Sequence, residues 1–272
     1  MKHGHGRVRR TFRALPTLFR VGFAEALAYR AEMFVWILAT TMPLIMLALW
    51  LAVARDAPVG RLGEPQLIAY FLSTFIVRQL TGSWVSWQMN MEVRDGTLAM
   101  RLLRPVHPFI AYAAEQLAVV PVRGFASIPM AIIALLSVGT LPLSHDAFIW
   151  ILWVPAMLGA WLITFLASFT IGCLSFFVES SMKIMDIWLA LFLVFSGYLI
   201  PTELFPPAVR ALADCLPFRY QIGLPVELMT GAHDRIAAIV LVEHQWLVVV
   251  VLAGASIVAW RRGLGRFAAY GG

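Results

Sequence analysis

Long apolar runs separated by short polar segments dominate this chain. An α-helix rises about 1.5 Å per residue, so about 20 apolar residues cross a bilayer core of about 30 Å. Each run is therefore predicted to be a transmembrane helix, and the pattern predicts an all-α membrane protein with six spans. The runs are residues 33–54, 67–89, 109–143, 148–178, 184–200 and 245–260.

The run at residues 109–143 is longer than one span needs. Pro121, Arg123 and Gly124 interrupt it, and proline normally ends or kinks a helix. We therefore expect an interfacial helix over residues 109–120 and the third span over residues 124–141. Arg123 would then lie at the inner boundary, where its long side chain can reach water.

Composition agrees with a membrane location. Of the 272 residues, 61% are apolar and only 13% are charged, against roughly 25% charged residues in soluble domains. We expect no cleaved signal peptide, because no short apolar stretch with a small-residue cleavage site follows the basic start. Cys173 and Cys215 are too few for a disulfide framework or a zinc site, and no metal is expected.

The basic residues are distributed unevenly between the spans. Six spans place both chain ends on one side, and fourteen of the 21 Lys and Arg then fall on that side against five on the other. The positive-inside rule therefore predicts cytoplasmic termini, with residues 91–108 also cytoplasmic. The net charge of +6 follows from this distribution, and no nucleic-acid partner is implied.

The first 32 residues form a separate segment in this interpretation. Arginines alternate with phenylalanine and leucine over residues 7–31, which predicts an amphipathic helix lying in the membrane interface. A simple basic tail is the alternative. We divide the chain into this N-terminal segment, residues 1–32, and a membrane domain, residues 33–272.

The polar insert at residues 91–108 carries the clearest functional signal. Gly96 interrupts the preceding helix, and Thr97 is predicted to cap a new helix over residues 98–104. Pro105 ends that helix. The result is a short rigid element facing the cytoplasm.

An apolar stripe on this insert predicts a docking surface. Leu98, Leu102 and Leu103 fall on the new helix, and a soluble partner would cover them. An ordinary cytoplasmic loop is the alternative interpretation.

Residues 201–244 differ from the spans. Prolines divide them into short amphipathic pieces such as residues 208–216, none long enough to cross a bilayer. We expect re-entrant or interfacial helices over residues 201–226, whose free backbone groups must be buried by protein. Glu203 and Glu227 flank this region and are expected to be solvated loop charges, with a gate at the outer exit as the alternative.

Arg78 lies inside the second apolar run. A charge within a span costs several kcal/mol unless it is paired or hydrated, and it points to function by default. Contact with an anionic headgroup, a buried structural pair and snorkelling to the interface all remain open.

The insert also resembles a known motif. Glu92-Val-Arg-Asp-Gly-Thr-Leu98 followed by Leu102-Leu-Arg-Pro105 is similar to the coupling-helix region of ABC-2 type permeases, the membrane subunits of ABC exporters. Gly197-Tyr-Leu-Ile-Pro201 with the prolines that follow, and the tail from Gly263 to Tyr270, resemble the same family. The resemblance covers nearly the whole chain by order of elements.

The resemblance implies a fold like that of type V ABC exporters. Its parts are an N-terminal connecting helix, six transmembrane helices, a coupling helix at residues 91–108 and re-entrant helices at residues 201–226 before the last span. The implied ATPase-coupling residues are Glu92, Arg94, Asp95, Gly96, Thr97, Leu98, Arg101, Leu102, Leu103, Arg104 and Pro105.

Two further sets of residues are assigned with this scheme. A second cytoplasmic contact is predicted at Glu179, Lys183 and Asp186, with a local pair between Lys183 and Asp186 as the alternative. The family analogy has spans 2 and 5 line the substrate path and spans 1 and 5 form much of the dimer contact. Path residues are then Arg78, Gly197 and Tyr198.

The resemblance also implies partners and location. The chain lacks a Gly-x-x-x-x-Gly-Lys-Ser/Thr phosphate loop, so ATP and Mg²⁺ are expected on a separate ABC ATPase subunit and this chain is not expected to be an enzyme. A second permease, identical or paralogous, and membrane lipid complete the partners. We expect a multi-pass protein of the bacterial inner (cytoplasmic) membrane that exports a lipid-like or amphiphilic substrate.

Two other functions remain as alternatives. A membrane enzyme acting on lipid needs clustered His, Asp, Ser or Glu at one membrane face, and the carboxylates of this chain are dispersed. A membrane assembly factor without transport activity leaves the insert and the broken segment at residues 201–226 without a purpose.

Overall fold

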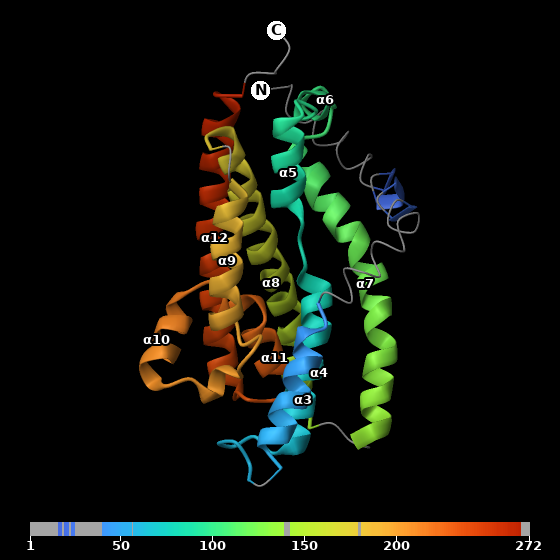
Figure 1. Ribbon diagram of the computed structural model, residues 1–272, viewed down its shortest axis with the longest axis vertical. Helices are drawn as coiled ribbons and strands as arrows, with labels where there is room; N and C mark the ends of the chain where they lie inside the picture. Colours follow the sequence, from blue (N-terminus) through green and yellow to red (C-terminus); the bar gives the residue numbers. More distant parts are fainter. Residues whose placement is uncertain are drawn as a thin grey trace.

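The computed structural model describes residues 40–55, 57–138, 142–178 and 181–267, with scattered positions between residues 16 and 24. Within these residues the protein is helical, and its long helices run side by side along one axis (Figure 1). The N-terminal segment, residues 1–32, lies almost entirely outside the described part, so its amphipathic helix stays a prediction.

The elements follow one another as a series of long helices interrupted by short ones. The helices are α3 (Met42–Val53), α4 (Glu64–Thr81), α5 (Val85–Arg94), α6 (Leu98–Leu102), α7 (Pro108–Val138), α8 (Ala147–Cys173), α9 (Ser181–Phe195), α10 (Pro207–Cys215), α11 (Gly223–Met229) and α12 (Arg235–Leu264). The short 3₁₀ turns are η1 (Leu174–Phe176), η2 (Thr202–Leu204) and η3 (Arg219–Gln221).

Two of the described helices are long and apolar enough to cross a membrane. They are α8 with its following turn, residues 147–176, and α12. Both confirm predicted runs, although α12 begins ten residues before the expected residue 245. The number of spans stays a prediction, because α3 has only 12 described residues and the first run begins outside the described part.

The pair α8 and α12 forms the centre of the protein. Gln245 on α12 is fully buried and donates hydrogen bonds to the carbonyl oxygens of Ala156 and Tyr220, both at 2.9 Å. Farther along the same pair, the hydroxyls of Thr170 and Ser256 lie 2.8 Å apart. Polar side chains therefore fix the relative position of two apolar helices.

The predicted second span is broken. The expected continuous helix over residues 67–89 is wrong, because α4 ends at Thr81 and α5 begins at Val85. Arg123 from α7 donates to the carbonyl oxygen of Gly82 at 2.9 Å, and a Cβ at Gly82 would lie 2.8 Å from that guanidinium. Glycine therefore lets a side chain from another helix take the place of a helical hydrogen bond.

The predicted division of residues 109–143 is also wrong. α7 is one helix from Pro108 to Val138, with Pro121 and Pro129 inside it, and Figure 1 shows it changing direction part-way. Backbone groups in an apolar environment must find partners within the helix, so a proline there bends the helix more readily than it ends it. At 1.5 Å per residue, α7 is about 46 Å long and exceeds the core thickness of about 30 Å.

The segment after α9 consists of short helices, as predicted. α9 ends at Phe195, and Gly197 then reverses the chain with φ of +83°. The amphipathic helix expected at residues 208–216 is α10, which starts one residue earlier. α11 follows, and all seven of its residues are buried.

Packing between α8 and α12 yields a stability prediction. A Cβ at Gly159 on α8 would lie 2.7 Å from the Gln245 amide, which two hydrogen bonds hold in place. We expect Gly159→Ala to lower the free energy of unfolding by about 1–3 kcal/mol through overpacking. Thermal unfolding of the purified protein, followed by tryptophan fluorescence, measures this.

Gly254→Ala on α12 is the matched control. A Cβ at Gly254 meets no atom within 4 Å, so this change should leave stability equal or slightly higher, because alanine favours helix. Equal unfolding temperatures for the two variants would contradict the prediction, because they would show that a methyl group fits between Gly159 and Gln245 without cost.

Candidate functional site

The polar insert lies at the same end of the protein as the C-terminal end of α12 (Figure 1), and the ring centroids of His107 and Trp260 lie 5.8 Å apart there. Gly96 turns the chain with φ of +72°, a conformation that glycine adopts without strain. The new helix, α6, spans only Leu98–Leu102 and so ends before the predicted residue 104. Thr97 precedes it but does not cap it, because its hydroxyl donates back to the carbonyl oxygen of Glu92 at 3.5 Å.

Arg101 is the centre of a buried ion network that holds the insert. Its guanidinium donates two hydrogen bonds to the carboxylate of Glu92 on α5, at 2.9 Å and 2.7 Å. The remaining terminal nitrogen donates to Glu115 on α7 at 2.7 Å. Tyr112, also on α7, donates its hydroxyl to Glu92 at 2.5 Å and stacks its ring 4.1 Å below the guanidinium carbon.

We call Glu92, Arg101, Tyr112 and Glu115 the insert clamp. The Arg101 side chain is 10% exposed, so the charges in the clamp are largely removed from water. Burial alone would lower the pKa of Arg101, but its hydrogen bonds to Glu92 and Glu115 raise that pKa above the ordinary value. Arg101 therefore keeps its charge, and the clamp ties α5, α6 and α7 into one unit.

The apolar stripe on the insert divides into an inner and an outer part. Leu98 is fully buried, and Leu102 packs against the main core. Leu103 is 80% exposed, and Met100 is 67% exposed. The surface available to a partner is therefore Met100 and Leu103, bordered by the exposed side chains Arg94, Asp95, Arg104 and Pro105.

The second predicted cytoplasmic set is only partly described. Glu179 lies outside the described residues. Lys183 and Asp186 are both exposed on α9, and no ion pair joins them, so the local pair is not formed. The start of α9 is held instead by a buried hydrogen bond of 2.7 Å from Asn90 on α5 to Ser181.

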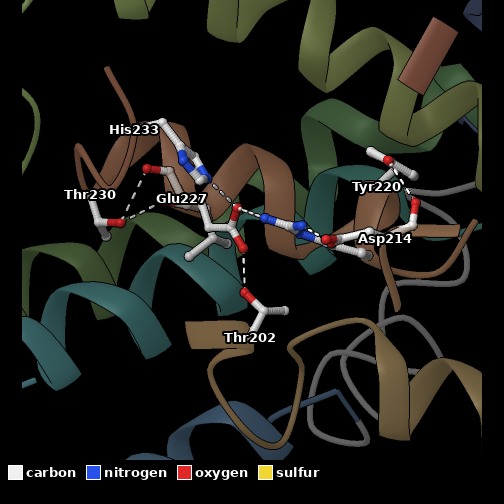
Figure 2. A network of polar contacts seen from close by, with 8 residues as sticks. Thr202, Asp214, Tyr220, Glu227, Thr230 and His233 are labelled. Carbon is white, nitrogen blue, oxygen red and sulfur yellow. Dashed lines mark hydrogen bonds and ion pairs between the residues drawn. The ribbon is translucent and has the colours of Figure 1, made fainter. Parts of the chain in front are cut away.

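A second buried network lies among the short helices, centred on Glu227 of α11 (Figure 2). Its carboxylate accepts hydrogen bonds from Thr202, from Arg219 at 2.8 Å and from His233 at 2.6 Å. Arg219 also pairs with Asp214 at the end of α10. These contacts tie η2, α10, η3 and α11 together.

The environment of Glu227 differs from the expected solvated loop. The residue is only 5% exposed. Burial would raise its pKa, but His233 and Arg219 hold the pKa below the ordinary value of 4.5. The carboxylate is therefore a structural anion, whereas Glu203 is exposed as predicted.

A polar cavity of about 450 Å³ borders this network. It is lined by Arg61, Leu62, Gln66, Tyr70, Pro142, Pro201, Thr202, Glu203, Arg210, Glu227, Thr230, Ala232 and His233. The loop from α3 to α4 contributes to the wall, and that loop lies at the end of the protein opposite α6 (Figure 1).

Arg78 and the other predicted path residues lie close together. Arg78, in the last turn of α4, has its guanidinium carbon 5.0 Å from the centroid of the Phe192 ring. Tyr198 is another of its neighbours. Gly197 allows close packing here, because the Tyr70 hydroxyl donates to its carbonyl oxygen at 2.8 Å and would clash with a Cβ.

Comparison with protein families decides what kind of protein this is. Residues 64–271, which include the insert, the short helices and the tail, match a family model described as ABC-2 family transporter protein. The chain belongs to the ABC-2 transporter family. A comparison with curated proteins found no match. As a member of this family, the chain is a membrane component of an ABC transporter and not itself an enzyme, and it is expected to associate with an ABC ATPase subunit.

Sequence analysis did not predict several side chains of the two buried networks of this ABC-2 protein. Tyr112 and Glu115 complete the insert clamp from α7, and Arg219 and His233 enclose Glu227. One signal in the sequence could have revealed Glu115. It is a charge within an apolar run, and such charges are expected to have a partner.

The insert clamp predicts that local order depends on Arg101. Arg101→Gln leaves two partly buried carboxylates without a charge partner, and loss of one member of a buried pair costs about 3–5 kcal/mol. We expect much faster amide hydrogen exchange over residues 97–104, with little change in α8 and α12. Exchange measured by mass spectrometry tests this.

Arg104→Gln is the control, because Arg104 is exposed in the same insert. It should leave the exchange pattern as in the wild type. Unchanged protection of residues 97–104 in Arg101→Gln would contradict the clamp.

The Glu227 network predicts a pH dependence of stability. Because the pKa of Glu227 is lower in the folded protein, the ionised network stabilises the fold above pH 4.5. This contribution is lost progressively as the pH falls below that value. In thermal unfolding measured as a function of pH, the stability of the wild type should therefore fall on the acid side. This fall should be smaller in Glu227→Gln.

Glu203→Gln serves as its control, because Glu203 lines the same cavity but is exposed. It should keep the wild-type pH dependence. If stability depends on pH in Glu227→Gln as it does in the wild type, then groups other than Glu227 cause the acid sensitivity.

Proposed function

We propose that this chain is the permease subunit of an ABC exporter. A separate ATPase subunit, which binds ATP and Mg²⁺, docks on α6 and drives export of a lipid-like or amphiphilic cargo. The observation that carries the proposal is the insert itself, in which an exposed apolar tip, Met100 and Leu103, stands on a base held by buried ion pairs. A flexible loop would absorb an applied displacement, whereas a clamped one transmits it.

The clamp defines the direction in which force travels. Arg101 connects α6 to Glu92 at the end of α5 and to Glu115 on α7. Movement of the ATPase subunit therefore displaces the ends of α5 and α7 together. Both helices reach the break at residues 82–84, where Arg123 and Gln116 of α7 hold the backbone of Gly82 and Trp84.

A second permease completes the transporter in this proposal. α3 and α9 bear exposed apolar side chains, among them Ile45, Leu49, Ile187 and Val194. A second copy or a paralogue covers part of this surface, and membrane lipid covers the rest. The path for the cargo runs along α4 and α9, where Arg78 and Tyr198 lie.

The orientation follows from the distribution of basic residues. We place α6, the start of α9 with Lys183 and Asp186, and both chain ends on the cytoplasmic side of a bacterial inner membrane. The polar cavity beside Glu227 then faces the outer side.

Replacement of Leu103 tests the docking surface without disturbing the core. Leu103→Asp places a charge on an 80% exposed side chain, so folding should be unaffected. We expect loss of at least about tenfold in affinity for the ATPase subunit, since a charge at the centre of an apolar contact must be desolvated. Co-purification and ATP hydrolysis by the reconstituted complex measure the effect.

Leu212→Asp on α10 is the matched control, because Leu212 is also an exposed leucine, 50% exposed, but lies on a helix remote from the insert. It should retain ATPase binding. Leu102 is unsuitable for this test, because it packs against the core. Stoichiometric ATPase binding by Leu103→Asp would contradict docking on α6.

A further inference from the structure

A small polar cavity lies beside the break between α4 and α5. Its volume is about 30 Å³, which is room for about two water-sized groups. The polar lining comes from the last turn of α4, the break itself, α8 and η3, and the apolar lining comes from α9. The lining residues are Arg78, Ser83, Thr164, Ser168, Gln221, Met185, Trp188, Leu189 and Phe192.

Hydrogen-bond donors face this cavity without acceptors. Gln221 is 1% exposed, and its amide oxygen accepts from Thr164 at 3.3 Å, which leaves the amide nitrogen without a partner. The buried hydroxyl of Ser83 has no partner either. Buried polar atoms in folded proteins are almost always hydrogen-bonded, so two unpartnered atoms at one cavity indicate a missing acceptor.

The cavity is also positively charged, which favours the same kind of acceptor. Among the residues that the structure describes, no carboxylate lies within ion-pair distance of Arg78, and no lining residue is acidic. The Tyr198 side chain and the Phe192 ring are neutral neighbours that compensate this cation only partly. A cation inside an apolar helix bundle without a full counter-charge is unfavourable, and an anion lowers that cost.

We propose that this cavity binds the acid group of an anionic amphiphile, which is the cargo. The acid oxygens, of a carboxylate or a phosphate, accept from Arg78, Ser83 and Gln221. The apolar body of the cargo lies along the side of α9 formed by Trp188, Leu189 and Phe192. This inference rests on the proposed export function and narrows its cargo from amphiphiles in general to acidic ones.

The size and position of the cavity support this assignment. A volume of about 30 Å³ accommodates the oxygens of an acid group but not a whole molecule, so the cavity recognises the charged end. It lies between α4 and α9, along the proposed path. A cationic amphiphile would place its charge against Arg78 and would be excluded.

Equilibrium binding to the full-length protein tests the inference. The protein is placed in nanodiscs of neutral phosphatidylcholine, and binding of radiolabelled decanoate is measured after subtraction of empty nanodiscs. Decyl phosphate, decanol and decyltrimethylammonium are the competitors. We expect decanoate to bind saturably, decyl phosphate to compete, and the neutral and cationic compounds to compete at least about tenfold more weakly. The relative affinities of the two acids distinguish a carboxylate cargo from a phosphate cargo.

Variants assign the binding to the cavity. Arg78→Gln should weaken decanoate binding about tenfold or more, whereas Arg55→Gln, which removes an exposed arginine from the α3–α4 loop, should not. Ser83→Asp is the second variant, because its carboxylate supplies Arg78 with an internal partner and leaves the protein folded while excluding the ligand. Loss of binding in both cavity variants supports the inference.

Equal competition by decanol, or wild-type decanoate binding in folded Arg78→Gln or Ser83→Asp, would overturn it. ATPase association is measured on the same preparations. A permease that binds its ATPase but does not discriminate decanoate from decanol refutes the acidic cargo alone. A permease that binds no ATPase refutes the export function.

Discussion

The ion pairs between Arg101 and the carboxylates of Glu92 and Glu115 fix the position of the insert, and the proposed coupling depends on that position. A buried pair of this kind adds little net stability, but removal of one partner is costly, so it fixes geometry more than it adds free energy. Here it joins three consecutive helices at one end of the molecule. The exposed tip of the insert, which would otherwise be a loose loop, becomes a fixed extension of α5 and α7.

The interior follows from the need to satisfy every backbone group in an apolar environment. Where the helix breaks between α4 and α5, Arg123 and Gln116 supply the missing partners. Where the chain divides into short helices, Gln245 bonds to the carbonyl oxygen of Tyr220, and Glu227 gathers Thr202, Arg219 and His233. Both of these irregular segments are thus bonded to side chains of other helices, and each borders a polar cavity.

Sequence patterns predicted the elements whose signals are local. The apolar runs of α8 and α12, the Gly96 turn, and the short helices between prolines are all present. The sequence does not predict the break after Thr81, because the break depends on a hydrogen bond from Arg123 of α7 to the carbonyl oxygen of Gly82. A single glycine in an apolar run gives no sign of that contact. Pro121 predicts a helix end when the sequence is considered alone, but an apolar environment tolerates it inside α7. The prediction of a solvated Glu227 is wrong because only the folded chain brings Arg219 and His233 to its carboxylate. The family model confirms the membership that the motifs suggested.

Site-specific labelling of the insert tests the central claim most directly. Cys215 is exposed and Cys173 is buried, so a Cys215→Ser background with Leu103→Cys carries one accessible thiol. A membrane-impermeant maleimide should label this thiol in inside-out vesicles and not in right-side-out vesicles, and the bound ATPase subunit should protect it. Labelling from the outer side, or equal labelling with and without the ATPase subunit, would contradict the coupling role of the insert.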